Sequence, residues 1–464
     1  METVSAEVHK RRWLIIGIIL IGSWVGTLGN SMLPVALPTI VQDFDVSLDL
    51  GVWVISIYTL LIAVLMPIYG WLSDRYGYRR LYVITLVGLG VSFGLAALAT
   101  SFWGLIGTRA LQALFNAATL PAVMGIISMI FPKHERGVAM GAWATVNGAA
   151  HGFGPVISGA LVENFGWQSI FVMNAAVTLA GAFLVFLVIP ADHKETRRPF
   201  DFAGAFTLTA AMLVLMFVLS RGEYLGWGSP LTIGLWVGVV TLLSLFIFTE
   251  RRVAQPFIEL SLFRNARYVS IVAVSSAQFF CLMGLPVLLS IFLIEVHHYG
   301  SGVAGLLIAP LASTLAISSP FGGRFADRVG FRLSILIGMA MVAVAAFTML
   351  FWSAEVSPWV IVPTLILAGI GMGLTQSQAA TGVTFVTRKS ELGIALGVFN
   401  MFRFISGTFS ATTFGILLEQ AGGSSSASLS AIHLGFGVVV AAACIAVILA
   451  ASSAHIRISE PGIP

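Results

Sequence analysis

A short charged segment occurs twice in this chain, each time between two long apolar runs. In both copies a glycine lies four residues before an aspartate, and an arginine directly follows that aspartate. An aspartate at a helix end can pair with a nearby arginine or with the amino end of a neighbouring helix. We therefore expect two clasps that open and close, although such charges could also serve only to fix membrane topology. The predicted clasp residues are Gly70, Asp74, Arg75, Gly77, Arg79 and Arg80 in the first copy, and Gly323, Asp327, Arg328, Gly330 and Arg332 in the second.

Two arginines lie inside apolar runs rather than between them. An arginine in hydrocarbon is costly and usually lines a water-filled or protein-buried path. Arg109 lies about five residues from the outer end of its run, so its long side chain could extend toward water. Arg403 lies about a dozen residues into its run, near the middle of a bilayer, and shares a helix face with Asn400. We expect Arg403 to face a cavity, with pairing to backbone carbonyls as the alternative.

Acidic residues are absent from the middle of every long apolar run. His151 is the one imidazole placed in a glycine-rich run, and imidazole can change charge near neutral pH. Arg109, His151 and Arg403 are therefore the coupling candidates. A histidine that only makes a local hydrogen bond is the alternative for His151.

The composition is that of a protein embedded in lipid. Of the 464 residues, 58% are hydrophobic and only 9% are charged, and the mean hydropathy is +0.97. A soluble protein would carry roughly a quarter charged residues. Cys281 and Cys444 show no metal or redox spacing. We expect an all-α polytopic membrane protein, with no metal site and no bound nucleic acid.

Charged and Gly/Pro-rich turns divide the chain into fourteen candidate transmembrane helices. These lie at 13–38, 50–71, 81–100, 104–131, 137–161, 168–190, 202–220, 231–250, 269–295, 303–322, 333–352, 358–384, 391–418 and 431–453. With a cytoplasmic amino terminus, Arg221 is the one basic residue on an external segment, and Arg109 and Arg403 lie within helices. This asymmetry predicts a multi-pass protein of the cytoplasmic (inner) membrane with both termini in the cytoplasm.

The repeated segment also predicts the division into domains. If it follows the second helix of each half, residues 1–190 form an N-terminal six-helix bundle and residues 269–464 a C-terminal one. Residues 191–268 are then an inserted transmembrane hairpin with cytoplasmic connectors. Duplicated halves of this kind are how secondary transporters build alternating access.

Several motifs resemble those of a known family. The 70–81 segment resembles the signature between helices 2 and 3 of the major facilitator superfamily, and Leu105–Ala113, with Arg109 and Gln112, resembles its helix-4 motif. The run 148–159 resembles the helix-5 antiporter motif, and 33–38 and 256–264 resemble the fourteen-helix drug:proton antiporter branch. The resemblance implies a major facilitator fold of two six-helix bundles plus an inserted hairpin.

The helix-5 motif also predicts a gate. Its glycines allow close approach of a neighbouring helix, and its proline removes a backbone hydrogen bond. The gate residues are Gly152, Gly154, Pro155 and Gly159. The chain departs from the branch in helix 1, where many members have a carboxylate and this sequence reads Leu-Gly-Asn-Ser at 28–31. That departure leaves both proton coupling and a preference for cationic drugs open.

Polar and aromatic residues on the helices that line the pathway in this superfamily are candidates for a substrate cavity, because amides in lipid must find partners. They are Asn30, Ser31, Gln112, Asn116, Asn147, Gln278, Phe279, Gln376, Gln378 and Asn400.

The function that this sequence favours is proton-coupled efflux of amphiphilic or drug-like compounds by alternating access. The expected partners are a small amphiphilic molecule, protons and the lipid bilayer, and the resemblance implies a monomer without cofactors. One alternative is a transporter of a neutral or anionic lipid or metabolite without proton/drug antiport. The other is a receptor that transports nothing. We do not expect an enzyme, because no catalytic acids, histidines or nucleophiles cluster at one membrane face, and the chain has no phosphate-binding loop for ATP.

Overall fold

The computed structural model describes residues 6–46, 48–51, 53–132, 135–189, 201–253, 256–299, 301–388, 391–419 and 425–452, and these contain helices and no strand. The long helices before the middle of the chain are α1 (Ala6–Ser31), α2 (Leu33–Asp43), α4 (Trp53–Tyr76), α5 (Tyr78–Ala97), α6 (Phe102–Asn116), α7 (Thr119–Ile130), α8 (Arg136–Phe165) and α9 (Gln168–Val188). Those that follow are α10 (Phe202–Leu225), α11 (Pro230–Glu250), α13 (Ala266–Ile291), α14 (Ser301–Val329), α15 (Phe331–Met349), α16 (Pro358–Val386), α17 (Leu392–Glu419) and α18 (Ser425–Ser452). Short helices are α3 (Leu48–Gly51), α12 (Ser261–Arg264) and the π-helical turn η2 (Phe292–Val296).

Among the described residues, thirteen helices are long and apolar enough to cross a membrane. The all-α membrane fold expected from composition is therefore confirmed. The remaining expected span, 137–161, falls on α8, which is 30 residues long but rich in glycine and polar side chains. Within its described residues, Val156–Phe165 forms a shorter apolar stretch. Fourteen crossings thus stay a prediction.

Two expected spans are each divided into two helices. The expected span 13–38 is α1 followed by α2, and the expected span 104–131 is α6 followed by α7. Proline has no N–H group, so Pro34 cannot bond the carbonyl of Asn30, and Pro121 cannot bond the carbonyl of Ala117. Each break lies within one turn before such a proline, whereas α4, α13, α14 and α16 continue through their internal prolines.

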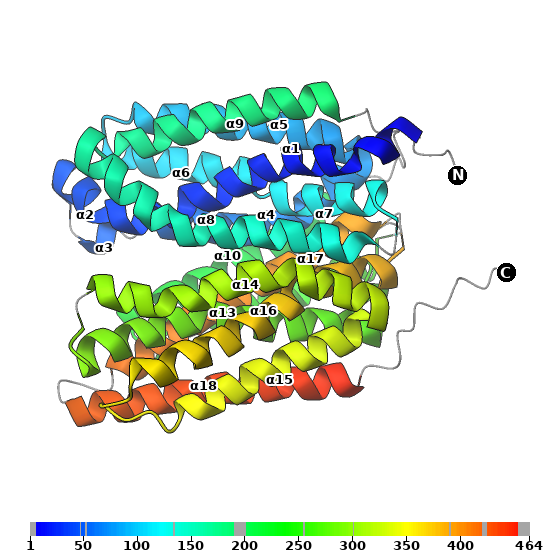
Figure 1. The fold of residues 1–464 in the computed structure, drawn as a ribbon. Helices are drawn as coiled ribbons and strands as arrows, with labels where there is room; N and C mark the ends of the chain where they lie inside the picture. Colours follow the sequence, from blue (N-terminus) through cyan, green and yellow to red (C-terminus); the bar gives the residue numbers. More distant parts are fainter. Residues whose placement is uncertain are drawn as a thin grey trace.

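The helices form two groups that lie against each other along their length (Figure 1). One group contains α1, α5, α6, α8 and α9, and the other contains α13, α15, α16 and α18. Across the seam between the groups, α8 packs along α14 and α4 packs along α17. At this seam α10 contacts both α4 and α17, and α11 packs along α10.

The start of α1 and the end of α18 lie at the same end of the molecule (Figure 1). At this end Arg12 forms an ion pair with Glu135, just before α8, with an N···O distance of 2.8 Å. At the same end, Arg79 at the start of α5 donates to the carbonyl of Phe186 near the end of α9. We call this the terminal end of the bundle.

Candidate functional site

The first predicted clasp lies at the terminal end and joins the two helix groups. The carboxylate of Asp74, in the last turn of α4, accepts hydrogen bonds from the backbone N–H groups of Gly393 and Ile394 at the start of α17. The hydroxyl of Tyr78 donates to the same carboxylate at 2.6 Å. A side chain at Gly70 would overlap the carbonyl group of Gly393, so the two helices cross here with their backbones in contact.

The second clasp has the same backbone geometry. A side chain at Gly323 of α14 would overlap the carbonyl group of Gly137, in the first turn of α8. The turn glycines also match, because Gly77 has a φ of 90° and Gly330 a φ of 93°. Residues with a side chain rarely adopt this conformation. The Asp327 side chain lies outside the described residues.

The clasp arginines make different contacts in the two copies. The guanidinium of Arg75 lies 5.1 Å from the Trp71 ring centre. In the second copy, Arg332 Nε donates to the carbonyl of Ala450 in α18 at 3.0 Å. Arg80 and Arg328 are exposed. The arginines therefore anchor neighbouring helix ends or face outward, whereas Asp74 reaches across the seam.

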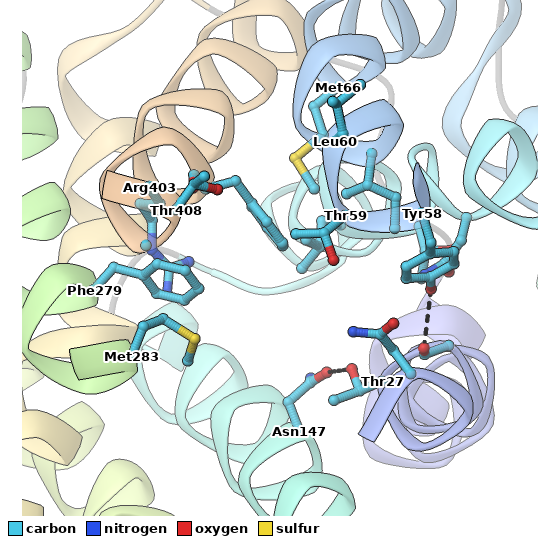
Figure 2. Close-up of a pocket in the computed structure, with 18 of the residues that line it drawn as sticks. Thr27, Tyr58, Thr59, Leu60, Met66, Asn147, Phe279, Met283, Arg403 and Thr408 are labelled. Atoms are coloured by element: carbon cyan, nitrogen blue, oxygen red, sulfur yellow. Dashed lines mark hydrogen bonds between the residues drawn. The ribbon is translucent and has the colours of Figure 1, made fainter. Parts of the chain in front are cut away.

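A cavity of about 400 Å³ lies between the two helix groups (Figure 2). Arg403 and Phe279 lie on one side of it, and Asn147 and Thr27 lie on another. None of the described residues that line it is an aspartate or a glutamate. The lining consists of Ser23, Gly26, Thr27, Asn30, Ile55, Ser56, Tyr58, Thr59, Leu60, Ile62, Met66, Asn116, Thr119, Leu120, Trp143, Asn147, His151, Met216, Ser220, Phe279, Met283, Gln376, Arg403, Phe404, Gly407 and Thr408.

Seven of the residues singled out from the sequence line this cavity. They are Asn30, Asn116, Asn147, His151, Phe279, Gln376 and Arg403. His151 and Arg403 come from opposite groups, on α8 and α17, and so face one common space. The ring Nδ1 of His151 lies 3.0 Å from the carbonyl oxygen of Asn147, one helical turn earlier.

The other five candidates, Ser31, Gln112, Gln278, Gln378 and Asn400, are not among the residues that line this cavity, so their role in binding substrate stays a prediction. Four of them bond groups within the helix bundle. Ser31 donates to the carbonyls of Leu28 and Ala150, Gln112 to that of Ser92, and Asn400 to that of Leu396. The Gln378 amide donates to the Ser377 hydroxyl. Gln278 is fully buried, and neither polar atom of its amide has a hydrogen-bond partner among the described residues.

Arg109 does not extend toward water, as its position in the sequence suggested, but lies fully buried behind the cavity wall. Its guanidinium donates to the carbonyl of Val54, to the side-chain oxygen of Gln112 and to that of Asn30. It also lies 4.1 Å from the ring centre of Tyr58. These partners explain why the charge turns inward, because the bundle supplies the hydrogen bonds that water would otherwise give.

The gate glycines of α8 do not all contact a neighbour. A side chain at Gly154 would overlap the hydroxyl of Ser31 in α1, whereas a side chain at Gly159 would meet open space. A neighbour therefore lies close to Gly154 but not to Gly159, and the role of both glycines in a gate stays a prediction. The side chains of Gly152 and Pro155 lie outside the described residues.

The candidates chosen from the sequence include none of the lining residues from α4, such as Tyr58 and Met66. They also miss the polar stripe of Ser23 and Thr27, which continues to Asn30 on one face of α1. The spacing of that stripe was the available signal. Tyrosine and methionine in an apolar run give no such signal, because they are equally common in cores. Among the described residues no group of three His, Cys, Asp or Glu side chains could hold a metal ion.

The sequence profile of the Major Facilitator Superfamily matches residues 19–411 of this chain. The chain belongs to this superfamily. It is therefore a multi-pass membrane transporter, and the family resemblance seen in the motifs is confirmed.

Superfamily members with similar sequences include several resistance proteins. The chain is 32% identical to the multidrug resistance protein Stp of Mycobacterium tuberculosis over 386 residues, covering 83% of this chain and 72% of that protein. It is 27% identical to the tetracenomycin C resistance and export protein of Streptomyces glaucescens, covering 90% of this chain and 78% of that protein. It is also 27% identical to the riboflavin transporter RibZ of Clostridioides difficile, with coverages of 84% and 87%.

The fold agrees with a solved structure of the superfamily. The human organic anion transporter MFSD10 (TETRAN) superposes with a TM-score of 0.69 over 95% of this chain and 99% of that chain. The sequence identity is 14%, so this likeness concerns the fold alone.

Proposed function

We propose that this transporter exports amphiphilic, drug-like compounds by alternating access, with protons moving the opposite way. The observation that carries the proposal is the cavity at the seam, which is lined by both helix groups and is large enough for a small molecule. Its methionines, Met66, Met216 and Met283, suit an adaptable apolar site. The resistance and export proteins named above support the same direction of transport.

The two bundles in this proposal are residues 1–190 and 269–464, with 191–268 as the inserted hairpin. The contacts across the seam support it, because each clasp pairs a helix of one bundle with a helix of the other, α4 with α17 and α14 with α8. The clasps close the seam through the backbone contacts at Gly70 and Gly323. Release of the clasps would let the bundles rock apart at the terminal end.

The terminal end is cytoplasmic in this proposal, because the basic residues of the clasps and of Lys10–Arg12 lie there. The chain then stands in the inner membrane as a monomer, with both termini in the cytoplasm. Its closed clasps make the conformation described here the outward-facing one. The position of Asn30 and Ser56 in the half of α1 and α4 distant from the terminal end agrees with a cavity biased outward.

His151 is the proposed proton site, because it is the titratable imidazole that lines the cavity. Glutamine in its place keeps a polar side chain but carries no proton at any working pH. We expect His151→Gln to lower gradient-driven efflux at least tenfold while substrate still exchanges across the membrane without a gradient.

Transport of a fluorescent amphiphile into inverted proteoliposomes tests the proposal. Wild-type protein is expected to accumulate the dye when the vesicle lumen is made more acidic than the medium. The dye should leave again when this pH gradient is collapsed. Accumulation that persists unchanged after collapse would contradict proton coupling, and absence of uptake for every amphiphile tested would contradict export itself.

A second candidate function is transport of a neutral or anionic substrate without proton antiport. The specific observation in its favour is that Arg403 faces a cavity without a carboxylate among its described lining residues.

A further inference from the structure

Among the described residues two arginine side chains are almost completely buried, and they differ in the hydrogen-bond partners of their guanidinium groups. Arg109 is 0% exposed and Arg403 is 2% exposed. Arg109 has a backbone carbonyl and two side-chain oxygens as hydrogen-bond partners, in addition to the ring of Tyr58. Arg109 therefore shows how many hydrogen-bond partners a buried arginine with a structural role has in this protein.

Arg403 has fewer hydrogen-bond partners than Arg109. Its Nη1 donates one long hydrogen bond, 3.3 Å, to the side-chain oxygen of Asn400. Its Nε is buried and has no hydrogen-bond partner among the described residues. Its guanidinium lies 4.6 Å from the ring centre of Phe279 and 5.6 Å from that of Phe399. The two rings shelter the faces of the guanidinium but leave its N–H groups in need of acceptors.

A buried charge without a partner is strongly unfavourable, so an arginine in this position needs an anion at some stage of its cycle. No carboxylate among the described lining residues can supply it. The anion therefore has to arrive from the cavity. Guanidinium groups bind carboxylates, sulfonates and phosphates through two parallel hydrogen bonds, which matches the donors that Arg403 leaves free.

We propose that Arg403 binds the anionic group of the substrate, so that the transported compounds are amphiphilic organic anions. The inference rests on the proposed function, since it takes the cavity to be the transport site. The anionic group pairs with Arg403, and the apolar body of the compound lies against Phe279 and Met283 (Figure 2). Phe404 lines the same space. A cationic drug is disfavoured here, because it would meet the guanidinium and no acid among the described lining residues.

Three congeners of one aromatic dye, carrying a carboxylate, a neutral amide or an amine, test the proposal on the purified full-length chain. Trp143 lines the cavity, so quenching of tryptophan fluorescence reports binding. Wild-type protein is expected to bind the carboxylate at least tenfold more tightly than the amide, and the amine most weakly. Arg403→Gln is expected to bring the carboxylate-to-amide ratio close to one, whereas Arg403→Lys keeps a preference for the anion at reduced affinity.

Thermal unfolding without ligand separates this role from a structural one. Arg403→Gln removes an unpaired charge and is expected to unfold at the wild-type temperature or above it, whereas Arg109→Gln is expected to unfold several degrees lower. Destabilisation of Arg403→Gln to the level of Arg109→Gln overturns the inference. Failure of wild-type protein to favour the carboxylate over the amide overturns it as well.

Transport of the same congeners distinguishes a failure of the proposed anion site from a failure of the proposed export function. If the amide is exported and the carboxylate has no advantage, the anion site is wrong and the exporter stands. If the carboxylate binds through Arg403 and none of the congeners crosses the membrane, the anion site stands and the export function is wrong.

Discussion

The carboxylate of Asp74 caps the amino end of α17 across the seam, at 3.0 Å and 3.1 Å from the backbone nitrogen of Gly393. The first N–H groups of a helix have no partner within the helix and carry a partial positive charge. A carboxylate from the opposite bundle therefore stabilises the closed terminal end through both hydrogen bonds and charge.

Asp74→Asn should weaken this clasp without changing the size of the side chain. The loss of a charge-assisted hydrogen bond to a helix end corresponds to about 1–2 kcal/mol, which shifts a two-state population roughly tenfold. We expect more molecules open at the terminal end. Distances between spin labels on the terminal-end loops of the two bundles measure this shift, and unchanged distance distributions would show that Asp74 only fixes topology.

Gly70→Ala and Gly323→Ala should separate the bundles at the same end, because the added carbon overlaps the backbone of Gly393 or Gly137. Each change forces the crossing helices apart, at a cost of about 1–3 kcal/mol to the closed state. The matched control is Gly94→Ala, since a side chain at Gly94 meets nothing within 4 Å. We expect accessibility of cysteines at the terminal end to rise in the first two variants and to stay at the wild-type level in the control.

Gly154→Ala and Gly159→Ala change equivalent residues of one helix in different surroundings. At Gly154 the new methyl group displaces Ser31 and pushes α8 from α1, so we expect a loss of roughly 1–3 kcal/mol in stability. At Gly159 the space is open, and alanine should stabilise the helix by up to about 1 kcal/mol. Midpoints of thermal unfolding in detergent are expected to fall in the first variant and rise slightly in the second. Equal midpoints would contradict the contact with α1.

Arg109→Lys should destabilise the N-terminal bundle although it keeps the charge. Lysine cannot reach the carbonyl of Val54, Gln112 and Asn30 together, because it lacks the planar fork of the guanidinium. Breaking a buried charge network of this kind costs about 3 kcal/mol or more. Chemical unfolding should show the loss, and Arg109→Lys with wild-type stability would mean that the network is dispensable.

Much of the fold could be predicted because the lengths of the apolar runs and the positions of the charged residues can be read from the sequence. The repeated Asp74 segment marked a glycine-to-backbone crossing of α4 with α17, and its second copy a crossing of α14 with α8. The depth of Arg403 along its helix agrees with its place in the cavity lining, and its role stays a prediction. Pro34 and Pro121 lie in the first turn after the two breaks, where each removes a backbone donor.

Which side of a helix faces the cavity could not be predicted in the same way. In helices that are apolar all round, no periodic pattern marks the inner face. Asn116 and Gln112 lie one turn apart on the same side of α6, yet Asn116 lines the cavity and Gln112 bonds Arg109, so the side of the helix alone does not decide the environment. Only the packing of neighbouring helices decides between such positions.

The lack of an acid among the described residues that line the cavity has a consequence for the energy source of transport. Cytoplasm is electrically negative, so an organic anion that leaves it moves down the voltage and releases about 2.3 kcal/mol per charge for every 100 mV. A carrier whose binding site prefers negative cargo can therefore run on voltage and has less need of a titrating carboxylate buried among its helices.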